Sequence, residues 1–305
     1  QDITFVNIVI AGGSGLVGTA LIPKLQSKGY SVDIITRYPD QPMPMANVRY
    51  FHWDAEHAWH PAVGAASAVI NLTGASMAGG SWTDAYKKEI RDSRVRTTQM
   101  LVEAQPRVLL QASAVGIYGD GGDAILTESS PAGKTFLADV AVEWEAAAAA
   151  ARGTGGRVCC FRIGPILSRE AGMLQALIKP PMLPFSPYSL GLGGPLGPGT
   201  QWVPWVHIDD VVGMIMAAID DENWTGAVNT VAPGCVTMKE IAVAIGRELR
   251  KPAALKVPSW ALKLILGEFA DALLVSQRVS AERAKALGYT FAFPDIASAL
   301  KDLMH

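Results

Sequence analysis

Three glycines at a spacing of three residues follow an apolar run near the start of the sequence. Residues 6–11 are mostly apolar and rich in β-branched side chains, and Gly12, Gly15 and Gly18 come directly after them. Glycine lets the backbone turn tightly, lets a pyrophosphate approach the N-terminus of a helix, and lets helix and strand pack closely. With a buried strand before it and a helix after it, this spacing predicts a dinucleotide-binding turn. The residues expected to contact the dinucleotide here are Gly12, Ser14, Gly15, Leu16, Val17 and Gly18.

The end of the second predicted strand distinguishes between the two nicotinamide dinucleotides. An acidic residue at the end of that strand, 31–36, would accept the ribose 2′-hydroxyl of NAD(H) and repel the 2′-phosphate of NADP(H). The sequence has Thr36 and Arg37 there, and Asp33 lies three residues too early. The Arg37 guanidinium can hold a phosphate and stack on adenine, and Thr36 can donate a hydrogen bond. We therefore expect NADP(H) as the cofactor.

Strand-like and helix-like segments alternate through the first half of the chain. Short runs rich in β-branched or apolar residues predict buried strands, and longer segments with helical patterns separate them. This alternation is typical of an α/β protein with a doubly wound parallel sheet and right-handed crossovers. The predicted strands are 6–11, 31–36, 48–53, 68–72, 107–113 and 157–163, and the predicted helices are 18–28, 83–105 and 136–152.

The second half of the chain has a different character. Residues 165–204 are rich in proline and glycine, and a loop of that size is usually functional or mobile. Beyond it, the sequence predicts a returning helix and strand at 208–219 and 227–231, and then helices at 237–250, 258–275, 277–287 and 294–304. We expect a Rossmann NADP-binding domain over 1–165 with return segments at about 205–233, and a smaller, mostly helical substrate lobe made of 166–204 and 234–305.

Composition and charge argue against several classes of protein. The 305 residues are 50% hydrophobic and 18% charged with a formal net charge of −2, so neither nucleic acid nor a membrane surface is an expected partner. No apolar run approaches the roughly 20 residues of a membrane span, and no signal peptide is visible. Three cysteines cannot form a disulfide framework. We expect a cytoplasmic protein, organellar if a transit peptide has been removed, and either a monomer or a homodimer.

Two hydrolase classes are also disfavoured. His57 and His60 are close in sequence, but no His-Glu-x-x-His pattern exists, and a solvated loop explains them better than a zinc site. Gly13–Ser14–Gly15 differs from the strand–helix elbow of a serine hydrolase because it belongs to the glycine turn. We therefore expect no metal, and a small molecule as the substrate.

Together, motifs spread over the chain resemble the extended branch of the short-chain dehydrogenase/reductase superfamily, in its NAD-dependent epimerase/dehydratase group. More narrowly, the chain resembles the poorly characterised "epimerase family protein" subgroup, some of whose members carry a cell-division-inhibitor label. The resemblance runs over almost the whole length. It rests on the segments 12–18, 70–74, 82–83, 93–94, 113–120, 144–145, 190–197, 205–210, 288–289 and 293–295.

The resemblance implies further cofactor contacts. Trp53 and Asp54 are expected beside the adenine, Leu72 and Thr73 beside the adenosine ribose, and Gly164 and Ile166 near the nicotinamide. Arg94 is chemically suited to a phosphate, and Glu89 to a ribose hydroxyl or to orienting Arg94; an exposed ion-pairing helix face is the alternative for both. The positions added by the resemblance are Asp54, Leu72, Thr73, Gly74, Glu89, Arg94, Ser113, Gly164 and Ile166.

The catalytic pair of such enzymes is missing. Relatives place a serine or threonine at the end of the fifth strand and a Tyr-x-x-x-Lys on the next helix, where the lysine and the nicotinamide ribose lower the tyrosine pKa for proton transfer. Ser113 fits the first position, but none of the seven tyrosines has a lysine four residues on. Alignment on Trp144–Glu145 puts Leu137 and Ala141 at the two positions, and neither side chain can transfer a proton.

Two functional interpretations follow. In the first, the chain is an NADP(H)-dependent, epimerase/dehydratase-like oxidoreductase with relocated acid–base chemistry. Ser113 would then hydrogen-bond the substrate, and the proton would come from Tyr118, Asp139, Glu143 or His207. Tyr118 has the best chemistry, although a packing role in its Tyr-Gly-Asp turn explains it better. In the second, the chain keeps the cofactor but is a catalytically silent NADP(H)-binding sensor or regulatory partner, with a link to cell division.

A glycine-rich loop is the expected substrate-facing wall. Residues 190–197 are followed by Gln201, Trp202 and Trp205, and tryptophans beside flexible glycine suit a lid over a flat or apolar ligand. The alternative is that both tryptophans anchor the small lobe. The residues expected to face the substrate are Gln201, Trp202 and His207.

Overall fold

Seven strands form one parallel sheet in the part of the chain that the computed structural model describes, residues 6–38, 48–53, 57–180 and 183–305. Their order is β11-β7-β5-β4-β1-β2-β3. The strands are β1 (Asn7–Ala11), β2 (Ser31–Thr36), β3 (Val48–His52), β4 (Ala68–Asn71), β5 (Val108–Ala114), β7 (Arg157–Ile163) and β11 (Gly226–Thr230). This is the predicted doubly wound fold, and β1 and β4 flank the point where the strand order reverses.

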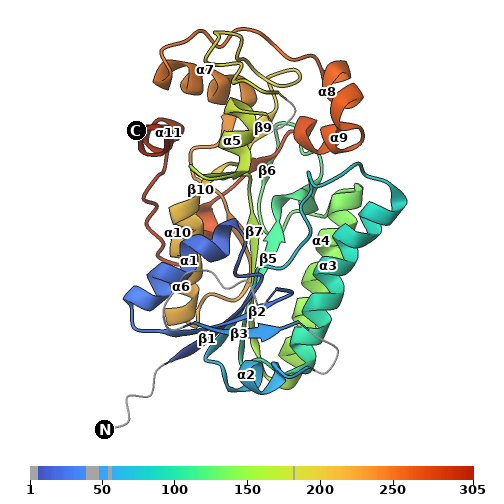
Figure 1. Cartoon of the computed structure of the whole chain (residues 1–305), viewed down its shortest axis with the longest axis vertical. Helices are drawn as coiled ribbons and strands as arrows, with labels where there is room; N and C mark the ends of the chain where they lie inside the picture. The colour runs from blue at the N-terminus through green and yellow to red at the C-terminus, as the bar shows by residue number, and fades with distance from the viewer. Residues whose placement is uncertain (1–5, 39–47, 54–56, 181–182) are drawn as a thin grey trace.

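Helices cover both faces of this sheet, with α1 and α6 on one side and α3 and α4 on the other (Figure 1). The helices around the sheet are α1 (Leu16–Ser27), α2 (His60–Ala65), α3 (Asp84–Glu103), α4 (Phe136–Ala149) and α6 (Ile208–Asp220), with 3₁₀ turns at Val115–Tyr118 and Ala150–Thr154. Successive residues of β1 alternate between the two faces: Ile8 and Ile10 pack toward α1 and α6, whereas Val9 and Ala11 pack toward α2, α3 and α4. Burial on both faces explains why the strand segments are apolar without a break.

A second group of elements lies over one end of the sheet (Figure 1). Its helices are α5 (Gly172–Ile178), α7 (Met238–Glu248), α8 (Ser259–Leu266), α9 (Phe269–Leu274) and α11 (Ile296–Met304). Beside the sheet lies α10 (Glu282–Ala286), which contacts β11. Pairs of two-residue strands link these parts: β6 (Ile125–Leu126) with β13 (Arg278–Val279), β8 (Ile166–Leu167) with β10 (Val206–His207), and β9 (Trp202–Val203) with β12 (Val236–Thr237). A separate apolar core, which includes Trp205, Ile241 and Leu300, holds α5, α7 and α11 together.

Two helix predictions in this group were wrong. The helix expected over 277–287 begins only at Glu282, because Arg278 and Val279 pair with β6 and the Ser280 amide donates to the Leu126 carbonyl at 2.8 Å. The helix expected over 258–275 is divided into α8 and α9 at Gly267, whose φ of +59° ends α8.

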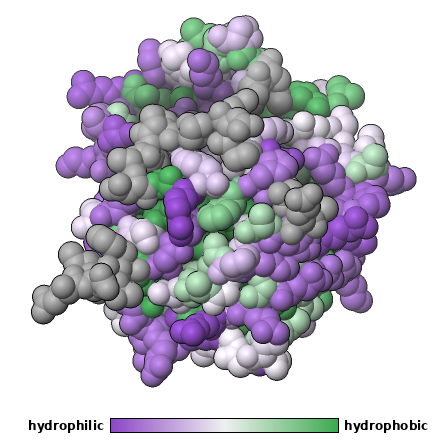
Figure 2. Space-filling model, turned by 60° about the horizontal axis from the view of Figure 1, so that its bottom comes forward, coloured by the Kyte–Doolittle hydropathy of each residue, from purple (hydrophilic) through white to green (hydrophobic). Residues whose placement is uncertain are grey.

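On the face shown in Figure 2, hydrophilic residues predominate and apolar residues form smaller groups. No helix among the described residues is long and apolar enough to cross a membrane.

Candidate functional site

The turn between β1 and α1 has the tight geometry that its glycines predict. Gly12 has a φ of +80°, and a Cβ there would lie 2.9 Å from the Leu72 carbonyl carbon. A Cβ on Gly18 would lie 2.2 Å from the Gly13 carbonyl oxygen. Gly15 is the N-cap of α1, so no side chain covers the first backbone N–H groups of the helix. The positive end of the helix dipole is therefore open to an anion.

A cavity of about 580 Å³ opens beside this turn, at the carboxyl ends of β1, β2 and β4. Most of the cofactor contacts expected from the sequence meet here, although they come from four separate segments of the chain. The expected contacts that line this first cavity are Gly12, Ser14, Gly15, Thr36, Arg37, Leu72, Thr73, Gly74 and Glu89.

Charge at the end of β2 is positive. The Arg37 side chain is exposed, its guanidinium carbon lies 5.6 Å from the centre of the Tyr38 ring, and it forms no ion pair with a described residue. Asp33, by contrast, is 1% exposed and accepts hydrogen bonds from Arg49 at 2.6–2.7 Å and from Asn7 at 2.9 Å. The Asp33 carboxylate of β2 thus stabilises the edge of the sheet by binding Arg49 of β3, and Arg37, not Asp33, lines the first cavity.

Arg94 of α3 is a buried cation without an ion-pair partner among the described residues. It is 8% exposed, its guanidinium donates to the carbonyls of Ile90 and Ala75 at 2.9 and 3.1 Å, and its Nε has no partner. Trp144 covers it, with the guanidinium carbon 5.2 Å from the ring centre. Desolvation lowers the pKa of Arg94 to about 10, so it remains protonated at neutral pH. A buried cation of this kind is costly unless an anion comes to it.

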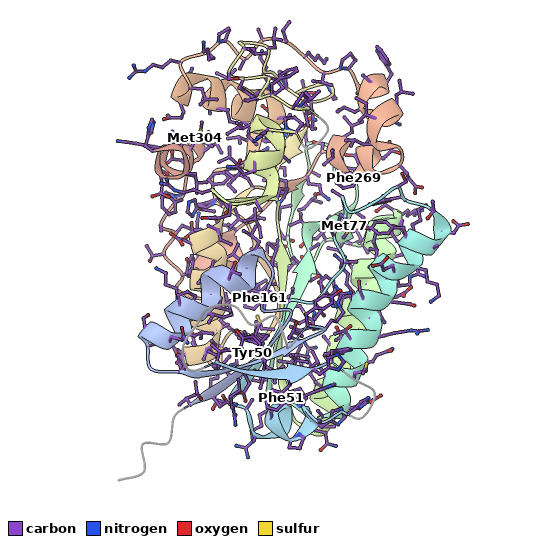
Figure 3. All side chains as sticks on the ribbon, in the orientation of Figure 1. Tyr50, Phe51, Met77, Phe161, Phe269 and Met304 are labelled. Atoms are coloured by element: carbon purple, nitrogen blue, oxygen red, sulfur yellow. The ribbon has the colours of Figure 1, made fainter. Side chains whose placement is uncertain are left out.

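A second cavity, of about 570 Å³, lies on the other side of Arg94. Arg94 lines this cavity, and a Cβ on Gly74 of the first cavity would lie 2.9 Å from its guanidinium carbon, so the two cavities meet at this residue. The second cavity is also lined by Ala114 and Gly164, at the ends of β5 and β7. Phe269 of α9 lies near Met77, which follows β4, at the side where the lobe meets α3 and α4 (Figure 3).

Comparison of the chain with models of known protein families gives matches to two segments. The model of the NAD-dependent epimerase/dehydratase family matches residues 8–230, and a domain of unknown function matches residues 257–303. The chain belongs to the NAD-dependent epimerase/dehydratase family.

Its relatives are similar over nearly the full chain. "Epimerase family protein SDR39U1 homolog, chloroplastic" of Arabidopsis thaliana is 35% identical over 97% of this chain and 86% of its own. "Epimerase family protein Mb2239" of Mycobacterium bovis is 37% identical over 96% of both chains. The crystal structure of the human epimerase family protein SDR39U1 (isoform 2) with NADPH has a TM-score of 0.83 at 29% identity, and covers 98% of this chain and 99% of the human one.

This family member has an apolar wall at the two positions aligned with Tyr-x-x-x-Lys. Leu137 and Ala141, together with Val140 between them, line the second cavity on α4. Ser113 is 4% exposed and donates its hydroxyl proton to Glu145 Oε1 at 2.6 Å. Glu145 in turn holds Arg162 through two hydrogen bonds of 2.9 Å. Ser113 is not among the residues that line either cavity.

Tyr118 belongs to the same buried network. It is 4% exposed, its hydroxyl donates to Asn229 Oδ1 at 2.5 Å and accepts from Arg162 at 3.0 Å, and it lines neither cavity. Burial raises its pKa, against the opposing effect of Arg162. With its proton engaged and its pKa raised, Tyr118 is placed to brace strand ends rather than to exchange protons with a ligand. We therefore assign no catalytic role to Ser113 or Tyr118.

The other candidate proton donors are dispersed. Asp139 is exposed, and Glu143 forms an exposed ion pair with Arg91 at 3.3 Å. His207 is 1% exposed and caps α6, where its Nδ1 accepts from the Asp209 amide at 3.1 Å. Among the described residues, none of these three side chains lines the second cavity.

The residues expected to face the substrate lie elsewhere in the lobe. Gln201 is buried and donates to the Leu196 carbonyl at 2.9 Å. Trp202 donates to Asp123 at 2.9 Å and lines a groove beside α7 and α11, and His207 lines a hollow beside α1 and α11. Since none of the three lines the second cavity, we assign them no role as substrate contacts.

Some predicted cofactor contacts have other positions. Val17 and Gly18 lie in the first turn of α1 and do not line the first cavity, Leu16 lines the hollow beside His207, and Ile166 begins β8. Gly164 lines the second cavity, and Asp54 lies outside the described residues.

Sequence reasoning missed the aromatic wall of the second cavity. Trp82 and Trp144 carry part of the family resemblance, but no sequence pattern predicts a role in the site for them, nor for Met77 and Phe136. The available signal was the position of Trp82 before α3 and of Phe136 at the start of α4, since both segments begin at the carboxyl end of the sheet.

The described residues contain no group of three or more histidine, cysteine or acidic side chains able to hold a metal ion.

Proposed function

We propose that this chain binds NADP(H) across the two cavities and uses it in an oxidoreductase reaction on a small molecule in the second cavity. The observation that carries the proposal is Arg94, a cation more than nine-tenths buried, without an ion-pair partner among the described residues, at the junction of the two cavities. A dinucleotide phosphate is an anion of the size and charge that this position requires.

The described residues fit the dinucleotide part by part. Its pyrophosphate would lie over the open N-terminus of α1, where a side chain on Gly12 would clash, and near Arg94. The adenosine 2′-phosphate would be held by Arg37, and a ribose hydroxyl by Glu89. The nicotinamide would reach Gly164 in the second cavity.

The residues that line the second cavity suit a redox reaction of the bound cofactor. When bound, a reduced nicotinamide supplies a hydride ion, that is, two electrons and a proton. The residues of the second cavity exclude water with Trp82, Phe136 and Leu137 and place the substrate beside Gly164. A dry wall favours hydride transfer because water competes neither for the substrate nor for the electrostatic interactions in the site.

A second candidate function is an NADP(H)-binding sensor that does not turn over. Leu137 and Ala141 favour it, because both line the second cavity and neither can transfer a proton. The two candidates differ in one measurement: NADPH that binds tightly without oxidation by any carbonyl or sugar-nucleotide compound, but changes the affinity for a partner protein, favours the sensor.

The cofactor assignment is tested with Arg37→Ala and titration of NADPH and NADH, followed by nicotinamide fluorescence. Because Arg37 would pair with the 2′-phosphate, which NADH lacks, we expect the substitution to weaken NADPH binding about tenfold, or about 1.4 kcal/mol, and NADH binding, which would lose only stacking on adenine, much less. Arg107→Ala, an exposed arginine at the opposite end of β5, is the control. Equal affinities of the wild type for the two cofactors, or equal losses for both in Arg37→Ala, would contradict the assignment.

A further inference from the structure

Aromatic rings form much of the second cavity, and their polar atoms are already engaged. The Trp82 indole donates its N–H to the Met77 carbonyl at 2.9 Å, and the Trp144 indole donates to Thr98 at 3.0 Å. Trp82 also packs against Phe136, with ring centres 5.5 Å apart. These side chains therefore offer a ligand only carbon surface and ring faces, which favour flat, apolar molecules.

The charges of this cavity do not suit a diphosphate. Beyond Arg94, which the proposed function assigns to the dinucleotide, the charged lining residues are Lys134, Glu268 and Asp271. Glu268, the N-cap residue of α9, and Asp271 of α9 already pair with Lys87 and Lys263, at 2.5 and 2.7 Å. One lysine beside two carboxylates is a poor site for a ligand with two negative phosphates, because recognition of phosphate relies on clustered cations.

The apolar patch on α4 restricts the reaction as well. Leu137, Val140 and Ala141 occupy the cavity wall where proton transfer is expected in relatives, so this wall donates no proton. Hydride addition to an isolated ketone produces an alkoxide, a strong base that needs such a donor. Hydride addition to a conjugated carbonyl produces an enolate or a phenolate, and a phenol has a pKa of only about 10. A delocalised anion of this kind can leave the site or take its proton from water.

We propose that the second cavity binds a flat, conjugated carbonyl compound of the quinone class without phosphate groups. The inference rests on the proposed function. The overall reaction balances: the quinone gains two electrons and one proton as hydride from NADPH, both of its carbon–oxygen double bonds become single bonds as the ring becomes aromatic, and water protonates the phenolate to give the hydroquinone and NADP⁺. The protein supplies the apolar slot and the orientation, and the α4 wall supplies no proton.

The binding test uses the full chain saturated with NADP⁺, which cannot reduce the probe. Isothermal titration calorimetry measures the binding of 2-methyl-1,4-naphthoquinone and, separately, of UDP-glucose. In Leu137→Trp a larger side chain fills the cavity, whereas Val142→Trp adds the same side chain to the outer face of α4, where Val142 is 44% exposed. We expect quinone affinity to fall at least tenfold in Leu137→Trp and to be unchanged in Val142→Trp, with no binding of UDP-glucose.

A turnover measurement complements the binding test. NADPH oxidation by the wild type should be at least a hundredfold faster with 2-methyl-1,4-naphthoquinone than with cyclohexanone, whose product anion is not delocalised. If NADP⁺ binds but the quinone does not, if UDP-glucose binds instead, or if Leu137→Trp binds the quinone as well as Val142→Trp does, the substrate class is wrong while the proposed function stands. If NADP⁺ itself does not bind, the proposed function is wrong and this inference with it.

Discussion

Two buried arginines at this site differ in whether an acidic side chain pairs with them. Arg94 is buried without an ion-pair partner in the described part of the chain, whereas Arg162, also buried, is held by Glu145 through two hydrogen bonds. A paired buried charge stabilises local structure, and an unpaired one costs stability until a ligand arrives. Sequence reasoning placed Arg94 on the cofactor side only through the family resemblance, because an arginine in a charged helix segment looks like a surface residue. Its burial in the folded chain is the observation that supports a role in binding the cofactor.

Arg94→Met should therefore separate binding from stability. We expect NADPH affinity to fall by about 1.5–3 kcal/mol, since a charge-assisted contact is lost. The free energy of unfolding without cofactor should stay equal or rise, because a desolvated cation is replaced by an apolar side chain. Fluorescence titration and urea denaturation measure the two effects. Arg96→Met, exposed on the same helix, should change neither, and a large loss of stability in Arg94→Met would show that Arg94 is structural.

His207 makes stability depend on pH. Burial lowers its pKa, and the nearby carboxylates of Asp209, Asp302 and Asp210 oppose this only in part. The pKa of His207 is therefore lower in the folded chain than in the unfolded chain, where it is about 6.5. As the pH falls below about 6.5, the unfolded chain takes up the proton first, and the folded state loses stability relative to it. His207→Asn keeps an acceptor for the Asp209 amide without this titration. The wild type should thus lose stability relative to His207→Asn between about pH 7.5 and about pH 5.5 in urea denaturation; a constant difference would exclude the titration.

At the scale of elements, the turn from β1 into α1 is the part that sequence predicts best. Its strand, its glycine spacing and its helix are adjacent in the chain, so local rules describe it completely. The segment 277–287 is the opposite case. A helix was expected there, but pairing of Arg278 and Val279 with β6 forms an extended segment instead. The partner strand lies far away in sequence, and no local pattern announces it.

Gly12→Ala and Gly29→Ala test how far the β1–α1 turn depends on close approach. Both glycines have a positive φ, +80° and +83°, but a Cβ at Gly12 would meet the Leu72 backbone at 2.9 Å whereas a Cβ at Gly29 would meet nothing within 4 Å. We expect Gly29→Ala to cost about 1 kcal/mol of backbone strain, and Gly12→Ala about 3 kcal/mol from strain and overpacking together. Urea denaturation of both variants measures the difference, and equal losses would mean that the contact with Leu72 is readily relaxed.

For the whole molecule, the important relation is the closure of the small lobe over the second cavity. Glu268, the N-cap residue of α9, and Asp271 of α9 line that cavity. Glu268 pairs with Lys87 of α3, and the ring centres of Phe269 and Trp82 are 5.7 Å apart. The neighbouring helix α8 buries little, since Trp260 and Leu264 are 70% and 80% exposed. A helix pair with so few buried contacts should open more readily than the sheet.

Phe269→Ala should loosen α8 and α9 without unfolding the domain. Loss of the ring removes the contact with Trp82 that helps to hold α9 against the start of α3. We expect faster amide hydrogen exchange over 259–274 and unchanged protection in β1 and β5, measured by mass spectrometry. Trp260→Ala, which removes an exposed ring, should leave exchange at its wild-type rate. Accelerated exchange throughout the sheet would instead mean that the lobe and the sheet unfold together.

The amino-acid sequence by itself determined the alternation of strands and helices, the glycine turn and the positive charge after β2, because each depends on residues within a few positions of one another. Only the tertiary structure decided which side chains share a cavity. Ser113 is engaged by Glu145 and Tyr118 by Asn229, while Trp82, Phe136 and Leu137 come together as a wall. These contacts join different elements, and their geometry follows from how helices and lobe pack on the sheet. The sequence showed that the Tyr-x-x-x-Lys pair is missing; packing decided that an apolar surface stands in its place.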